Sequence, residues 1–144
     1  GGGLIAGIAL VLKVLNPRIR IIGVQAEVIP SMKAALEKGA PISLAPATTI
    51  ADGIAVRKVG ETPLELVKKH VDEIVTVSEG EIANAVLLLM EIEKTIAEGA
   101  AAAPLAALIN KKVNLTDKNI ALIVSGSALV IYNAFAISIG ERSR

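Results

Sequence analysis

The sequence has 144 residues, enough for one domain with a hydrophobic core, and 53% of them are hydrophobic while only 1% are aromatic. We therefore expect a core of small aliphatic side chains, which favours tightly packed α/β layers. A formal net charge of +1, without a long run of either sign, argues against a nucleic-acid partner. The absence of cysteine excludes disulfides and a thiol nucleophile and fits a reducing, cytoplasmic setting.

The apolar segments are too short for a membrane. The run at residues 4–15 is interrupted by Lys13, and the run at residues 128–139 falls well below the roughly 20 residues that a spanning helix needs. The three glycines at the start do not resemble a signal peptide, and a domain that begins inside a glycine loop suggests a cut chain. We expect no membrane association.

Segments of helix and strand type alternate along the chain. The pattern predicts helices at residues 4–16, 31–38, 62–70, from 79 onward, and from 99 to about 109, and strands at 20–24, 74–77 and 120–124. Strands separated by helices indicate parallel pairing with right-handed crossovers. The predicted fold is a three-layer α/β structure with helices on both faces of a parallel sheet, and ligands should bind beyond the carboxyl ends of its strands.

Two capping patterns mark helix starts. Thr62 and Glu65 have the spacing of a capping box, with a proline between them, and Ser78 with Glu81 repeats the pattern. The spacing in the second helix predicts a buried face that consists of Ile82, Ala85, Val86, Leu89, Ile92 and Ile96. Ser31 is a candidate cap for the helix at 31–38, and Gly39 is expected just past its end.

The first candidate site is the run of Gly1, Gly2 and Gly3 ahead of an apolar helix. Glycine lets backbone N–H groups approach a phosphate, and the helix N-terminus adds partial positive charge. The run lacks the lysine of a P-loop and the spacing of a dinucleotide site, so ATP and NAD fit poorly. Alone, it is equally compatible with a plain terminal glycine segment.

Several segments in order resemble the threonine dehydratase and serine racemase family. They are GGGLIAGIA at 1–9, GVQAE at 23–27, TIADGIAV at 49–56, VDEIVTVS at 71–78, AEGA at 97–100 and VSG at 124–126. The resemblance covers residues 1–126 and implies the C-terminal part of a catalytic domain of fold type II, similar to tryptophan synthase β. Residues 127–144 depart from the family and suggest a divergent or frameshifted tail.

The resemblance implies pyridoxal 5'-phosphate (PLP) as cofactor and assigns residues to it. Gly1, Gly2 and Gly3 would hold the phosphate, Gly53 would lie against the ring, Ser125 would contact the pyridine nitrogen, and Glu98 would join the polar network beside the ring. The alternatives are an ordinary turn glycine at 53 and a surface glutamate at 98. Asp52 is assigned no catalytic role, and His70 is interpreted as a solvated helix-end residue.

The departures from the family are equally informative. Gln25 and Ser31 stand where serine racemases carry two acidic metal ligands, so no metal is expected, and Gln25 favours L-threonine and L-serine as substrates. The Schiff-base lysine of the family is missing from this chain. Lys13 is expected to extend to solvent from its apolar helix, and Lys58, Lys68 and Lys69 lie on polar segments.

We therefore expect part of a threonine/serine ammonia-lyase, a cytoplasmic homo-oligomer of threonine catabolism or isoleucine biosynthesis that converts L-threonine to 2-oxobutanoate and ammonia. This chain alone would be inactive. The alternatives are a noncatalytic remnant or pseudoenzyme domain, serine racemase-type activity in the full-length protein, and an unrelated α/β domain that binds a small ligand. The sequence does not decide between threonine and serine.

Overall fold

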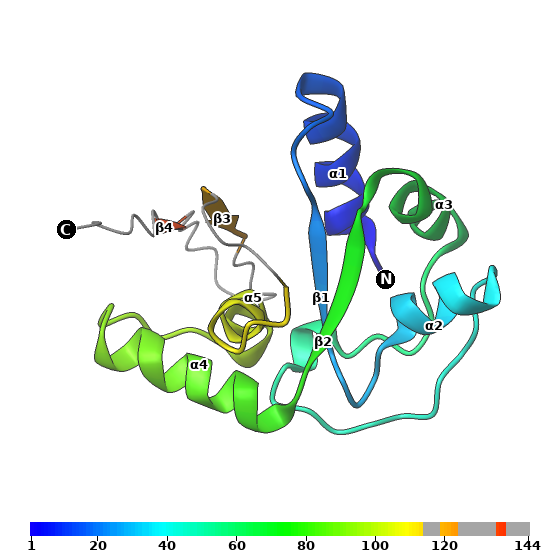
Figure 1. Cartoon of the computed structure of the whole chain (residues 1–144). Helices are drawn as coiled ribbons and strands as arrows, with labels where there is room; N and C mark the ends of the chain where they lie inside the picture. The colour runs from blue at the N-terminus through cyan, green and yellow to red at the C-terminus, as the bar shows by residue number, and fades with distance from the viewer. Residues whose placement is uncertain (114–118, 124–134, 138–144) are drawn as a thin grey trace.

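The computed structural model describes residues 1–113 and 119–123 and the backbone of residues 135–137 (Figure 1). The elements in chain order are α1 (Gly3–Leu15), β1 (Ile22–Ala26), α2 (Ser31–Lys38), the 3-10 turn η1 (Asp52–Ile54), α3 (Glu61–His70), β2 (Glu73–Val77), α4 (Glu79–Glu91), α5 (Gly99–Ile109), β3 (Ile120–Leu122) and β4 (Phe135–Ile137). No helix within the described ranges has the length and apolar character to cross a membrane.

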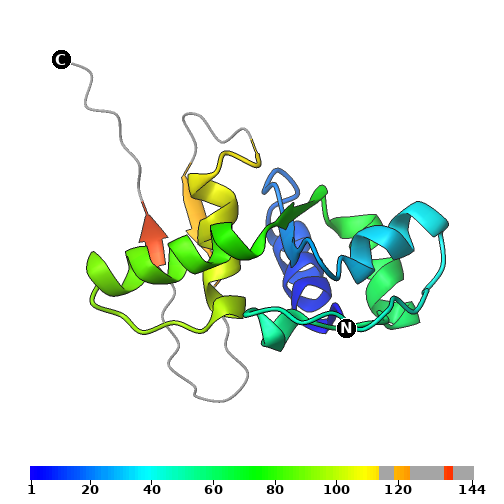
Figure 2. The same ribbon diagram turned by 90° about the horizontal axis from the view of Figure 1, so that it is seen from below.

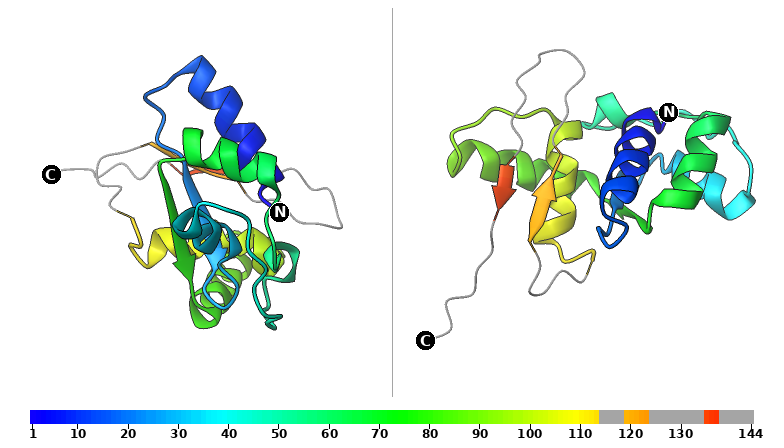
Figure 3. Two further views of the ribbon diagram at one scale, coloured as in Figure 1. Left: turned by 90° about the vertical axis from the view of Figure 1, so that its right-hand side faces the viewer. Right: turned by 90° about the horizontal axis from the view of Figure 1, so that it is seen from above.

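Strands β1 and β2 form a parallel pair. Their register runs from Ile22 opposite Glu73 to Ala26 opposite Val77, and α2, η1 and α3 lie in the connection between them. Helices α1 and α3 lie together on one side of the pair, whereas α5 lies on the other side with α4 packed outside it (Figures 1 and 3). The α/β class and the parallel pairing of these two strands are thus confirmed.

Two apolar clusters fill the space on either side of the strands. One joins the strands to α4 and α5, with the buried residues Ala26, Ile29, Ala51, Val75, Val77, Ile82, Ala85, Leu89, Ala100, Ala102, Ala103, Ala106 and Ala107. The other joins α1, α2 and α3 through Ala6, Met32, Ala35, Val59, Leu64 and Val67. Because alanine dominates the buried face of α5, this helix packs closely on the sheet, as the composition predicts.

A glycine in β1 lets helix α1 approach the sheet closely. A Cβ placed on Gly23 would collide with Cδ1 of Ile74 and lie 2.7 Å from Cδ1 of Ile5. A larger residue at position 23 would therefore push α1 away from the strands. Since the N-terminus of α1 carries the glycine run, this contact also helps to place that run.

The prediction for the third strand is wrong in its pairing. Strand β3 pairs antiparallel with β4, with Ile120 opposite Ile137 and Leu122 opposite Phe135, and does not join β1 and β2 within the described residues. Ile123, expected inside the strand, lies just beyond β3 and is exposed. A short apolar run can pair with any neighbouring edge, so its sequence does not specify the orientation of its partner.

Helix α4 is shorter than predicted. It ends at Glu91, and Ile92 and Ile96, which were expected on its buried face, are 68% and 91% exposed. The chain turns away because Lys94 has a φ of 54°, a left-handed conformation that ends a helix. The remaining predicted face, Ile82, Ala85, Val86 and Leu89, does turn inward.

The predicted helix caps are confirmed in part. Ser78 and Glu81 form the capping box, in which the Ser78 N–H donates to Glu81 Oε2 at 2.7 Å and the Glu81 N–H donates to Ser78 Oγ at 3.3 Å. Gly39 closes α2 with a φ of 74°, as expected. Helix α3, however, begins at Glu61 with Gly60 as its N-cap, so Thr62 lies inside the helix and caps nothing. Ser31 is likewise the first helical residue, after Pro30 as N-cap.

Candidate cofactor site

The glycine run forms the uncapped start of α1. Gly2 is the N-cap residue with a φ of 91°, no side chain caps the helix, and no acidic residue lies in its first turn. A Cβ on Gly2 would collide with Cε of Met32 and lie 3.2 Å from Cβ of Pro63. Both the left-handed backbone and the crowding therefore require glycine at this position.

The two flanking glycines face open space. Gly1 and Gly3 are exposed, and an added Cβ on either would meet nothing within 4 Å. The first amides of α1 are thus free of side-chain caps and accessible, and the helix dipole places partial positive charge on them. These residues fit a phosphate group, which the N–H groups of the first turn can hydrogen-bond.

The segment that contains Gly53 forms a tight turn. Gly53 is exposed within η1, where the Ile54 N–H donates to the Ala51 carbonyl at 3.0 Å and the Ala55 N–H donates to the Asp52 carbonyl at 3.0 Å. Asp52 contributes its backbone to the turn, and Ala51 is the N-cap of η1.

The start of α5 packs against this turn. Glu98 is the N-cap residue of α5, and its carbonyl accepts the Ala101 N–H at 3.0 Å. A Cβ on the next residue, Gly99, would collide with the carbonyl oxygen of Ile50 and lie 3.0 Å from the Ala51 nitrogen. The structure therefore brings the Glu98 turn to the segment that carries Gly53.

The three predicted places share one edge of the molecule. The N-terminus, η1 and the start of α5 follow one another along this edge in both Figure 2 and the right panel of Figure 3. A hydrogen bond from the Gly60 N–H to the Gly1 carbonyl, at 3.3 Å, also ties the glycine run to the start of α3. The glycine run, the turn that carries Gly53 and the start of α5 therefore lie along the same edge, although they are far apart in the sequence.

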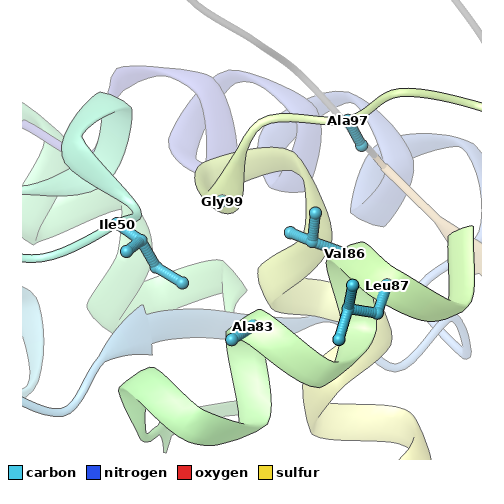
Figure 4. Close-up of a pocket in the computed structure, with 6 residues that line it drawn as sticks. All are labelled: Ile50, Ala83, Val86, Leu87, Ala97 and Gly99. Atoms are coloured by element: carbon cyan, nitrogen blue, oxygen red, sulfur yellow. The ribbon is translucent and has the colours of Figure 1, made fainter. Parts of the chain in front are cut away.

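A shallow apolar pocket of about 400 Å³ adjoins this edge (Figure 4). Its lining consists of Ile50, Ala83, Val86, Leu87, Ala97 and Gly99. None of these side chains is ionisable, so the pocket offers apolar contact and no acid–base chemistry.

Ser125, predicted to contact the ring nitrogen, lies outside the described residues, as does Gly126. The proposed contact at the pyridine nitrogen stays a prediction.

The lysines differ in how far their side chains are exposed to solvent. Lys58, Lys68 and Lys69 are exposed, as expected. The prediction for Lys13 is wrong, because its ammonium forms an ion pair with Asp72 and its side chain is only 18% exposed. The carboxylate and the Ile19 carbonyl both accept hydrogen bonds from the ammonium, which keeps it from extending to solvent.

Gln25 has a structural role that the sequence did not suggest. Its side-chain carbonyl accepts the N–H of Lys33 at 3.0 Å, so it satisfies an amide in the first turn of α2. Ser31, the second position compared with metal ligands, is 1% exposed. Across the part of the chain that the structure describes, no group of three His, Cys, Asp or Glu side chains is placed to hold a metal.

Sequence reasoning also missed Glu79, the first residue of α4. Its carboxylate accepts hydrogen bonds from the Thr49 hydroxyl and from the Ile50 N–H, the latter at 2.8 Å. Glu79 therefore contacts the segment that leads into η1. A partner 30 residues away carries no local signal in the sequence.

A sequence model for pyridoxal-phosphate dependent enzymes matches residues 1–126. The chain belongs to this family. Among pyridoxal-phosphate dependent enzymes, it is 48% identical over 126 residues to the L-threonine ammonia-lyase of Thermotoga maritima, which covers 88% of this chain and 31% of that protein. It is also 48% identical over 129 residues to the catabolic L-threonine dehydratase TdcB of Staphylococcus aureus N315, covering 88% of this chain and 37% of that protein.

Two solved structures share the fold. A threonine deaminase from T.th. is 38% identical, with a TM-score of 0.74, and the match covers 78% of this chain and 41% of that one. Maize serine racemase is 33% identical, also with a TM-score of 0.74, and the match covers 78% and 34% of the two chains. The chain thus spans about a third of the length of the curated relatives that it matches.

Proposed function

We propose that residues 1–126 are part of the catalytic domain of a PLP-dependent threonine/serine ammonia-lyase, which converts L-threonine to 2-oxobutanoate and ammonia. The observation that carries the proposal is the uncapped, glycine-lined start of α1, which shares one edge with η1 and the start of α5. The identity of 48% to an L-threonine ammonia-lyase favours threonine as substrate.

The residues of this chain would bind and orient the cofactor. When bound, PLP supplies an electron sink that eases loss of the α-proton and of the β-hydroxyl group. The amides that begin α1, with Gly1, Gly2 and Gly3, would hold the phosphate. Gly53 would leave room for the ring, Glu98 would join the polar groups beside it, and Ser125 would contact its nitrogen. The Schiff-base lysine would come from a part of the enzyme that this chain does not contain.

In the whole enzyme, we expect β1 and β2 to belong to a wider parallel sheet of fold type II, in three layers with helices on both faces. Among the described residues β1 pairs only with β2, which leaves backbone groups at both edges of the pair for further strands. On this proposal residues 127–144 are a divergent or frameshifted tail, and the enzyme is a cytoplasmic homo-oligomer. The lack of cysteine is compatible with a reducing, cytoplasmic setting.

Serine racemase-type activity is the second candidate, because maize serine racemase shares the fold at 33% identity. Two residues weigh against a metal-dependent version of it. The Gln25 side-chain carbonyl is engaged with the Lys33 N–H, and Ser31 is buried. A noncatalytic remnant is the third candidate, and it requires no particular residue at these two positions.

The experiment compares this chain with a version extended upstream through the lysine-bearing segment, with PLP and L-threonine. We expect the absorbance band of lysine-bound PLP in the extended protein only, together with release of ammonia and 2-oxobutanoate. Racemisation of serine without ammonia release would favour the second candidate. Binding of PLP without either reaction, or no binding, would leave the noncatalytic remnant.

A further inference from the structure

The segment from Thr49 to Ala51 is held from two sides. On one side, Glu79 Oε2 accepts the Ile50 N–H at 2.8 Å and Glu79 Oε1 accepts the hydroxyl of Thr49. The Thr49 oxygen in turn accepts the Ala51 N–H at 3.1 Å. The carboxylate of one residue therefore orients three consecutive residues of the loop.

Gly99 closes the other side of this segment, at the peptide between Ile50 and Ala51. The space for its missing Cβ is taken by the Ile50 carbonyl, whose carbon would lie 2.7 Å from an added Cβ. Figure 4 shows Ile50 beside α4 with Gly99 alongside, so α4 and α5 both border the loop at this point. The loop cannot move toward α5 without a clash, and moving away from α4 breaks the bonds to Glu79.

The turn that carries Gly53 comes directly after this peptide. Ala51 is fully buried and is the N-cap of η1, so the orientation of the Ile50–Ala51 peptide sets where η1 begins. We propose that Glu79 is a positioning residue: through Thr49 and the Ile50 amide it holds segment 49–51 against Gly99 and thereby fixes the place of Gly53 beside the cofactor ring. This inference rests on the proposed function, which gives Gly53 its place at the ring.

Loss of the hydrogen bonds to Glu79 should affect the site more than the fold. Hydrogen bonds to a charged group are stronger than neutral ones, and their loss leaves the local segment free to shift. The core around α4 and α5 is apolar and does not include Glu79. Misplacement of a site by about 1 Å can reduce a rate by roughly 100-fold, so a small shift of Gly53 is sufficient.

The test uses the upstream-extended protein loaded with PLP and four variants. Glu79→Ala removes the acceptor of the Ile50 N–H and of the Thr49 hydroxyl, and Thr49→Val removes that hydroxyl, which accepts the Ala51 N–H. Thr49→Ser keeps the hydroxyl, and Glu65→Ala removes a charge from the exposed face of α3 as a matched control. We expect hydrogen exchange to rise about tenfold at the Ile50 amide in Glu79→Ala and at the Ala51 amide in Thr49→Val. We also expect an altered fluorescence spectrum of the bound cofactor and a kcat about tenfold lower, with a smaller change in KM. Thr49→Ser and Glu65→Ala should match the parent protein in all of these.

Three results would overturn the inference in distinguishable ways. Faster amide exchange with an unchanged cofactor spectrum and unchanged kcat would reduce Glu79 to a purely structural contact, while the proposed function would stand. No lysine-bound PLP in the unsubstituted extended protein would remove the proposed function itself and, with it, the role of Glu79 at a ring. Exchange that does not change in Glu79→Ala would show that the bonds do not hold the loop.

Discussion

The ammonium nitrogen of Lys13 lies 2.8 Å from Oδ2 of Asp72, although the two residues are 59 positions apart. Lys13 also donates to the Ile19 carbonyl at 2.8 Å, and Asp72 accepts the Ile21 N–H at 2.7 Å. The pair therefore joins the last turn of α1 to the connection before β1 and to the start of β2. Helix α1 is largely apolar but can carry Lys13, because Asp72, just before β2, neutralises the charge of the ammonium group.

This ion pair predicts a dependence of stability on acid. The hydrogen bond from Lys13 holds the pKa of Asp72 below its usual value of 3.8. A carboxyl group with a depressed pKa stabilises the folded state above its unfolded pKa and loses that contribution as the pH falls through the folded value. Since the Asp72 side chain is 38% exposed, solvent screening limits the contribution. We expect Asp72→Asn to lower the free energy of unfolding at pH 7 by about 1 kcal/mol.

Urea unfolding of the parent protein and Asp72→Asn between pH 7 and pH 2 measures this contribution. The difference in unfolding free energy between the two proteins should shrink below about pH 4. Lys13→Met keeps the apolar stem and removes the charge, so it should show the same convergence. A difference that stays constant down to pH 2 would contradict the role of the ionised carboxyl group.

Two segments share the sequence pattern of a capping box, but only one of them forms it, so the local pattern alone does not determine where a helix begins. Ser78 and Glu81 form a capping box, whereas Thr62 and Glu65, with identical spacing, lie inside α3. The difference is where the helix starts: Gly60 takes the extended N-cap conformation, with φ of −76° and ψ of 156°. Its carbonyl accepts the Leu64 N–H at 3.1 Å, and its N–H bonds to Gly1. A contact with Gly1, far away in the sequence, is invisible to a local pattern.

The two patterns therefore predict unequal costs of substitution. Ser78→Ala should lower the free energy of unfolding by about 1 kcal/mol, because it removes the side-chain acceptor for the Glu81 N–H. Thr62→Ala should change it by less than about 0.5 kcal/mol, because an exposed residue within the first turn loses no cap. Thermal or urea unfolding of both variants checks this, and equal costs would contradict the assignment of the caps.

Glu81 adds a second acid-sensitive contact to the same cap. Burial alone would raise the pKa of Glu81, but hydrogen bonds from Lys112 and from the Ser78 N–H outweigh it and hold the pKa below 4.5. Lys112 Nζ lies 2.7 Å from Glu81 Oε1 and so ties the end of α5 to the start of α4. The ionised Glu81 carboxyl group contributes to folding stability above about pH 4.5, and this contribution is lost as the pH falls through the pKa of Glu81 in the folded state. Lys112→Met should reduce the acid dependence of stability relative to the parent protein.

The sequence predicted the parts of the site that depend on local chemistry. Glycines before an apolar helix indicate an anion-binding N-terminus wherever they occur, and the structure places Gly2 in the left-handed conformation that only glycine adopts easily. The roles of Glu79 and Gly99 could not be predicted from local sequence, because both residues act through contacts with Ile50, which is far away in the chain. The antiparallel partner of β3 was missed for the same reason: an apolar run specifies burial and not its neighbour.

The close contact at Gly99 predicts opposite effects for two similar substitutions. Gly99→Ala places a methyl group on the Ile50 carbonyl and should destabilise the protein by about 1 to 3 kcal/mol. Gly7→Ala adds its methyl group to the exposed side of α1, where nothing lies within 4 Å, and should stabilise it by about 0.5 to 1 kcal/mol. Unfolding midpoints of the two variants give the comparison. A Gly99→Ala variant as stable as the parent protein would mean that the backbone at Ile50 can move away from residue 99 at little cost.

Gly2 and Gly3 allow the fold and the cofactor to be tested separately. Gly2→Ala strains a left-handed backbone and collides with Met32, so both stability and PLP affinity should fall. Gly3 is the first helical residue and an added Cβ there meets nothing within 4 Å, so Gly3→Ala should leave the free energy of unfolding unchanged or slightly higher. The added methyl group would nevertheless hinder access of the PLP phosphate to the amides in the first turn of α1. In the upstream-extended protein we expect PLP to bind Gly3→Ala about tenfold more weakly, a difference of roughly 1.4 kcal/mol. Absorbance titration with PLP measures this, and unchanged affinity with unchanged stability would place the phosphate elsewhere than at the start of α1.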